Sequence, residues 1–143
     1  MMKIEYTRRS RDATRGNEVV EGTELLYLIE GSLKVYSDIE CFFDDPYMNL
    51  LEFAACLYKW LYISGGVNDF AFESVDHDEP ILVFKRIDKE KWVVDSIWRR
   101  GEALLVTGHE LMSAISEFLA RFDRDLHDEY GLAIESFSQR APY

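Results

Sequence analysis

The chain has 143 residues, of which 48% are hydrophobic and 30% are charged, and its formal net charge is −11. This composition is typical of a globular protein, and the length predicts a single domain over residues 1–143. The negative charge argues against nucleic-acid binding because it repels phosphate backbones, and no run reaches the roughly 18 apolar residues that a membrane span needs.

The cysteines and the N-terminal residues indicate the compartment. Cys41 and Cys56 lie in separate apolar runs, which argues against a metal finger and against a disulfide-rich secreted scaffold. The residues that follow Met1 are too polar for a secretory signal peptide. We therefore expect a soluble, cytoplasmic protein.

The first half of the chain reads as strands followed by a helix. A short strand around Lys3–Tyr6 precedes a polar stretch over residues 7–17, which we predict to be a mobile loop. Strand-like runs follow, with a bend or bulge at Gly31 and a turn at Asp38; they cover residues 24–30, 32–37 and 39–43. Their close spacing predicts antiparallel hairpins.

The first helix is predicted to begin at Asp44–Pro46, where an N-cap carboxylate precedes a proline, and to end at Gly65-Gly66. One side of it is apolar at helical spacing. The other side carries Tyr58 and Tyr62, with only two charged residues between positions 47 and 63. We expect burial between a sheet and a second helix, and the alternative is an apolar surface offered to a partner.

The second half repeats the order of strands followed by a helix. The second helix begins with a capping box, Thr107 and Glu110, and ends at Gly131. The strand-like segments are Phe70–Glu73, Ile81–Ile87, Trp92–Trp98, a short run at Ala103–Val106, and a last strand at Leu132–Phe137. The predicted class is α+β, with twisted antiparallel sheets and two main helices in the order strands, helix, strands, helix, strand.

The sequence contains no recognisable catalytic or cofactor-binding motif. It has no nucleophile elbow and no glycine-rich phosphate loop, and neither cysteine has the positively charged surroundings that lower a thiol pKa. His77 lies in a charged turn, and Asp123 and His127 lie one helical turn apart on a polar flank. We expect no catalytic residue, no metal and no cofactor; a metal- or carboxylate-dependent enzyme assembled from distant residues is an alternative.

The acidity predicts a basic protein partner, because opposite charge speeds the encounter of two proteins. The alternative is that the charge only confers solubility. Two acidic patches are candidate contacts: Asp76, Asp78 and Glu79 form one, and Asp123, Asp125, Asp128 and Glu129 form the other. Tyr58 and Tyr62 are candidate interface residues, for a partner or for a homodimer.

Several segments resemble small, uncharacterised bacterial proteins. They are Glu30-Gly31, Asp45-Pro46, Trp60-Leu61, Asp78–Phe84, Trp92–Trp98 and Leu111–Phe137. In size, acidity and aromatic content the chain is also similar to the immunity proteins of bacterial toxin systems. That resemblance implies a stoichiometric inhibitor of a basic toxin domain, such as a nuclease, with aromatic residues at the centre of the contact and carboxylates around it. The alternative is a structural module that self-associates.

Overall fold

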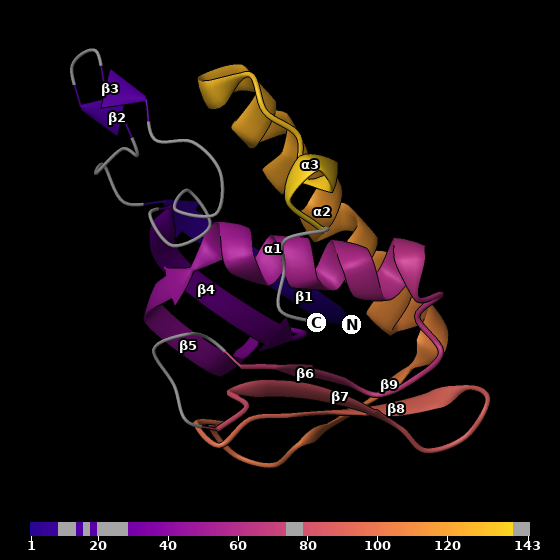
Figure 1. Ribbon diagram of the computed structural model, residues 1–143. Helices are drawn as coiled ribbons and strands as arrows, with labels where there is room; N and C mark the ends of the chain where they lie inside the picture. The colour runs from indigo at the N-terminus through magenta and orange to yellow at the C-terminus, as the bar shows by residue number, and fades with distance from the viewer. Residues whose placement is uncertain (9–13, 16–17, 20–28, 74–78, 139–143) are drawn as a thin grey trace.

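The computed structural model describes residues 1–8, 14–15, 18–19, 29–73 and 79–138, and it confirms the α+β class (Figure 1). The first half contains β1 (Met2–Arg8), β2 (Thr14–Arg15), β3 (Glu18–Val19), β4 (Glu30–Ser37), β5 (Glu40–Asn49), α1 (Leu50–Tyr58) and the π-helical turn η2 (Lys59–Ile63). The second half contains β6 (Phe70–Phe72), β7 (Leu82–Arg86), β8 (Lys91–Asp95), β9 (Leu104–Thr107), α2 (Gly108–Tyr130) and α3 (Glu135–Ser138).

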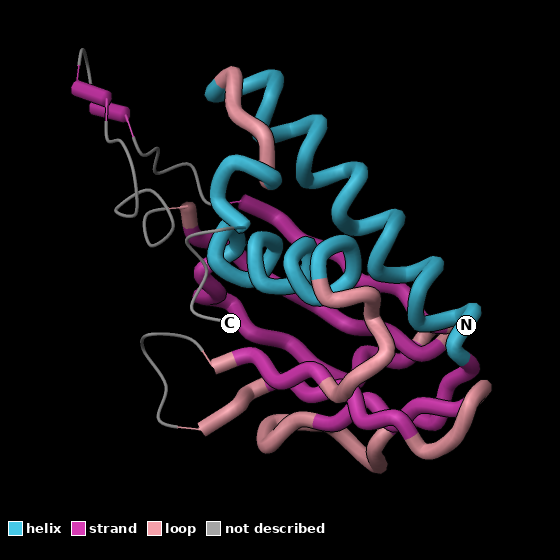
Figure 2. The backbone as a smooth tube through the Cα atoms, turned by 45° about the vertical axis from the view of Figure 1, so that its right-hand side comes forward, coloured by secondary structure: helices cyan, strands magenta, loops and turns pink. Residues whose placement is uncertain are grey.

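The strands form two antiparallel sheets, ordered β1-β4-β5 and β6-β7-β8-β9, and a separate β2-β3 pair. In each of the two sheets the strands lie side by side in the order in which they occur along the chain. A helix follows the last strand directly, α1 after β5 and α2 after β9. Figure 2 shows the two main helices side by side against the strands, and both of them contact the sheets directly. None of the helices in the described ranges is long and apolar enough to span a membrane.

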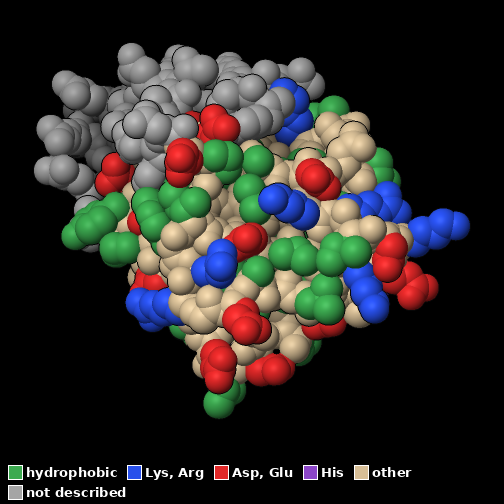
Figure 3. All heavy atoms as spheres, turned by 90° about the horizontal axis from the view of Figure 1, so that it is seen from below, with side chains coloured by type: hydrophobic (Ala, Val, Ile, Leu, Met, Phe, Trp, Pro, Cys, Tyr) green, Lys and Arg blue, Asp and Glu red, His purple; other side chains and the backbone are tan. Residues whose placement is uncertain are grey.

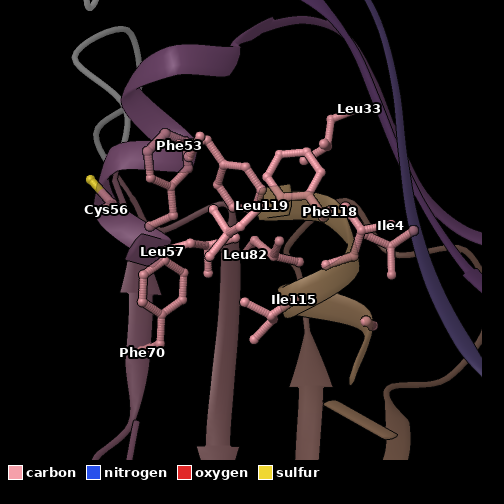
Figure 4. Close-up of a cluster of buried hydrophobic side chains, with 14 of the residues drawn as sticks. Ile4, Leu33, Phe53, Cys56, Leu57, Phe70, Leu82, Ile115, Phe118 and Leu119 are labelled. Atoms are coloured by element: carbon pink, nitrogen blue, oxygen red, sulfur yellow. The ribbon is translucent and has the colours of Figure 1, made fainter. Parts of the chain in front are cut away.

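One hydrophobic core joins both sheets and both main helices (Figure 4). Strand alternation places Phe70 and Phe72 of β6 inward and does the same for Leu82 and Phe84 of β7. Helix α2 contributes Ile115 and Phe118. All eight residues from Leu50 to Leu57 of α1 are buried. The expectation that this helix is buried on more than one side is therefore confirmed.

The predicted start of the first helix is wrong, because Asp44–Pro46 belongs to β5. Pairing between β4 and β5 shifts register in a bulge and resumes at Gly31 opposite Met48. A proline is tolerated here because β5 is the edge strand of its sheet. The helix begins at Leu50, whose N–H donates to the Ile29 carbonyl at 2.9 Å instead of to a side-chain cap.

The ends of the second helix were predicted correctly. Thr107 and Glu110 form a reciprocal capping box, and Gly131 ends the helix in the left-handed conformation, with φ of 67°. The strand predicted at Leu132–Phe137 is wrong, since this segment turns into the single-turn helix α3. It packs Ile134 and Phe137 onto the core without pairing to a sheet edge.

The predicted loop over residues 7–17 is wrong at its ends. Thr7 and Arg8 continue β1, and Thr14–Arg15 pairs with Glu18–Val19. Residues 9–13 and 16–17, and most of the strand-like run 24–30, lie outside the described residues.

Candidate functional site

A groove between the end of α1 and the middle of α2 brings together residues that lie far apart in the sequence. It has a volume of about 200 Å³, and we call it the tyrosine groove; its lining is Tyr58, Tyr62, Leu119, Ala120, Asp123 and Ile134. The Tyr58 and Tyr62 ring centroids are 4.8 Å apart, and 56% of Tyr62 is exposed. Both predicted interface tyrosines and one predicted acidic contact therefore share one surface.

The tyrosines lie where α1 widens into the π-helical turn η2. The Ser64 N–H donates to the Lys59 carbonyl at 2.9 Å, which is the spacing of five residues that defines a π turn. The buried Trp60 fixes this turn, since its indole N–H donates to the Asn68 carbonyl at 2.9 Å. Tyr62, two residues later, is left on the outside. Turns of this type are frequent at functional sites.

Carboxylates give the surroundings of the tyrosine groove a negative charge. The pKa of Tyr58 is raised above its ordinary value of 10.0, first by burial and then by the charges of Glu135 and Asp123 and by the neighbouring Tyr62. One Asp123 oxygen, Oδ1, accepts a hydrogen bond from the Ile134 N–H at 2.9 Å. Aromatic faces beside a carboxylate are suited to a cationic side chain, which gains a cation–π contact together with charge attraction.

Two other carboxylates of the second acidic patch contact the protein's own first strand. Asp125 accepts a hydrogen bond from the Tyr6 hydroxyl, and Glu129 accepts two from the Arg8 guanidinium. These contacts hold β1 against α2. Asp128 is exposed, and it makes no hydrogen bond or ion pair to the part of the chain that the structure describes. The four carboxylates of the second acidic patch therefore do not form one surface: Asp123 lines the tyrosine groove, Asp125 and Glu129 contact β1, and Asp128 is exposed to solvent.

The first acidic patch is only partly described, because Asp76 and Asp78 lie outside the described residues. Glu79 lines a hollow of about 560 Å³ on the outer face of the β6–β9 sheet. Two further carboxylates there are already used: Asp95 pairs with Arg99 at 2.7 Å, and Asp69 accepts from a backbone N–H. Figure 3, which views the molecule from this side, shows acidic and basic side chains interspersed among hydrophobic ones.

The described residues contain no metal site, and the buried thiol of Cys56 is not activated. No group of three or more His, Cys, Asp or Glu side chains there is arranged to hold a metal ion. Burial, and then the Glu52 carboxylate, raise the pKa of the Cys56 thiol to about 12. Cys56 is therefore protonated at neutral pH and lacks the character of a nucleophile.

Sequence reasoning singled out the tyrosines and Asp123 but did not place them together. It missed Leu119 and Ala120, which form the α2 side of the groove, and it missed the hydrogen bond of Tyr6 to α2. Ala120, a small residue on an otherwise charged face, was the one available signal of a close approach between helices.

Comparison with curated proteins and with solved structures gave no match. A family model described as a domain of unknown function (DUF7878) matches residues 2–128. The matched span starts at β1, includes both sheets and α1, and ends two residues before the end of α2. The chain therefore belongs to the DUF7878 family.

Proposed function

We propose that this protein acts in the cytoplasm as a stoichiometric inhibitor of the immunity type, which binds a basic toxin domain through the tyrosine groove. The observation that carries the proposal is the pair formed by half-buried Tyr58 and exposed Tyr62 beside Asp123, at a π turn. Tyrosine is among the residues that dominate binding energy in protein interfaces.

The shape and charge of the groove favour a basic side chain as its occupant. A volume of about 200 Å³ accommodates one long side chain rather than a drug-sized ligand. An arginine or lysine placed there meets the tyrosine rings and the Asp123 carboxylate. A cation–π contact contributes about 0.5–2 kcal/mol, depending on how far it is desolvated.

The overall charge supports the same class of partner. A net charge of −11 speeds the encounter with a basic domain and makes the association sensitive to salt. A stable interface buries roughly 1,600 Å² in total, so the groove supplies the anchor and the surrounding faces of α1 and α2 supply the rest. Glu135, exposed at the start of α3, is a described carboxylate close enough to act on Tyr58, and it can contribute at the rim.

The test is co-expression of the tagged chain with the product of the adjacent gene, followed by titration of the purified pair. We expect a one-to-one complex that weakens as salt is raised and that protects cells from the toxin. Tyr62→Ala should raise the Kd about tenfold or more. Tyr47→Ala is the matched control, because Tyr47 is equally exposed (59%) but precedes α1 at its other end.

Two results would count against the proposal. The first is the absence of a complex both in co-expression and in capture from the native cells. The second is an equal effect of the Tyr62 and Tyr47 substitutions on a complex that does form. Light scattering of the chain alone tests the homodimer alternative, which predicts a doubled mass that Tyr62→Ala reduces.

A further inference from the structure

Another hollow lies where α2 begins beside the β7–β8 hairpin. It has a volume of about 530 Å³, and we call it the indole hollow. Its lining includes Trp92 of β8, Gly108 and His109 of α2, and Arg86 and Lys89 of the hairpin. None of these residues lines the tyrosine groove.

The indole N–H of Trp92 faces the hollow and has no acceptor within the described part of the chain. Trp92 is only 3% exposed, and its Nε1 makes no hydrogen bond within the described part of the chain. The indole N–H of Trp60, by contrast, donates to the Asn68 carbonyl at 2.9 Å. The Nε1 atom is not itself shut off from solvent, so the N–H of this otherwise buried side chain is open to the hollow and available to an acceptor bound there.

A glycine keeps this donor uncovered. A Cβ added to Gly108 would lie 3.5 Å from Trp92 Nε1 and 3.8 Å from Cδ1, so the N–H edge of the indole faces the first residue of α2. Because Gly108 has no side chain, the space in front of the N–H belongs to the hollow.

The start of α2 adds a second donor. The Gly108 N–H donates to the Glu90 carbonyl at 2.7 Å, and the Glu110 N–H donates to Thr107 Oγ1 at 3.0 Å. The N–H of His109, between them, has no partner inside the helix, as is usual in a first turn. The N-terminus of this 23-residue helix also carries partial positive charge.

Most of the charged side chains around the hollow are positive, like the N-terminal end of α2. Arg86 lies with its guanidinium carbon 6.0 Å from the centre of the Trp92 ring, and Lys89 lies in the adjoining turn. Glu90 is the single carboxylate among the described lining residues. Between residues 79 and 107 the chain holds six basic and five acidic residues, so this region departs from the acidity of the whole.

We propose that the indole hollow binds an oxyanion group, a phosphate or a carboxylate. Trp92 Nε1–H and the His109 N–H donate hydrogen bonds to it, and Arg86 and Lys89 supply the compensating charge. An oxyanion fits because it only accepts hydrogen bonds, whereas a cation would meet two positive side chains and two N–H donors. The site is independent of the tyrosine groove and of the inhibitor function proposed for it.

The test is an NMR titration of the full ¹⁵N-labelled chain with sodium phosphate and, separately, with sodium acetate, at an ionic strength held constant with sodium chloride. We expect the Trp92 indole N–H and the His109 amide resonances to move along a saturable curve. The Trp60 indole resonance should stay in place because its N–H is already donated to Asn68. A response to phosphate alone or to acetate alone identifies which source of the oxyanion the site prefers.

Three variants separate binding from folding. Gly108→Ala places a methyl group at ordinary contact distance from Nε1, so the fold is retained and the Trp92 response is lost. Arg86→Gln should weaken the apparent affinity about tenfold, as expected for loss of a charge-assisted contact. Lys34→Gln, on β4 of the other sheet, is the control and should leave the titration unchanged.

The proposal is overturned if neither anion moves the Trp92 indole resonance in a saturable way. It is also overturned if the folded Gly108→Ala protein responds as the parent does, because the donor would then have no part in binding.

Discussion

Removal of the Tyr6 hydroxyl tests whether side-chain hydrogen bonds hold β1 against α2. The Tyr6 hydroxyl donates to Asp125, while its ring lies 5.6 Å from Phe118 and 5.2 Å from Phe122, measured between centroids. Tyr6→Phe keeps both ring contacts and deletes only the hydrogen bond. The change in stability therefore reports on that bond alone.

The expected loss follows from the surroundings of the bond. A hydrogen bond to a charged group contributes about 1.5–3 kcal/mol to stability. Asp125 is half-buried, so water replaces part of the interaction in the variant, and the lower end of that range applies. We expect the free energy of unfolding to fall by about 1.5 kcal/mol. Asp125→Asn should act on the same pair, and a double-mutant cycle should give a coupling energy of about 1 kcal/mol.

The same bond predicts a dependence on alkaline pH. Burial, and then the hydrogen bond to Asp125, raise the pKa of Tyr6 well above its ordinary value of 10.0. The folded state therefore holds this proton more tightly than the unfolded state does. The stability gained in this way is complete below pH 10 and is lost as the pH rises from 10 toward the folded pKa. In Tyr6→Phe this part of the alkaline decline should be absent.

The assay is urea unfolding followed by far-UV circular dichroism and tryptophan fluorescence, with the slope against urea used to check that the unfolded state is unchanged. Tyr36→Phe on β4 is the control, since its hydroxyl makes no hydrogen bond to any described residue. We expect the control to stay within about 0.5 kcal/mol of the parent. Equal stabilities for the Tyr6 and Tyr36 variants would refute the reasoning.

Three further predictions concern the core and the helix start. Thr107→Ala removes the α2 capping box and should lower the free energy of unfolding by about 1 kcal/mol in the same urea assay, whereas an unchanged midpoint would contradict the cap. Cys56 is buried, so it should resist thiol reagents in the native protein and react once the protein is unfolded. Because its pKa is raised to about 12 in the folded state, the stability that its protonated thiol contributes should decline as the pH rises from about 9 toward 12. Gly31→Ala would force a Cβ against the Thr7 carbonyl and within 2.9 Å of the Arg8 Cα, so the free energy of unfolding should fall by about 3 kcal/mol. A thermal melt equal to the parent's would show that β1 and β4 can move apart to accept the methyl group without loss of stability.

Elements with a local signal were predicted well from the sequence. The second helix has both a capping box and a terminal glycine, and its ends agree with Thr107 and Gly131 in the structure. The hairpin across residues 82–95 follows from two alternating strands around a polar turn. Asp38 makes the predicted turn between β4 and β5, with φ of 54°.

Elements decided by distant contacts were predicted poorly. Asp44–Pro46 has the local chemistry of a helix start, yet pairing with β4 keeps it in a strand. The segment Leu132–Phe137 alternates like a strand, but it lies beside α1 and α2, where no sheet edge pairs with it, so it packs as a short turn of helix. In both places the tertiary surroundings outweighed the local preference.

The candidate site divides in the same way. Composition and periodicity alone identified an acidic α+β chain with a weakly charged tyrosine side on its first helix, because these properties depend on residue type and spacing. Only the tertiary structure placed Asp123 beside the tyrosines and turned Asp125 and Glu129 toward Tyr6 and Arg8. These residues are neighbours on one helix, but successive side chains point about 100° apart, and the elements packed around α2 decide which carboxylate meets a partner from its own chain and which remains available to another molecule.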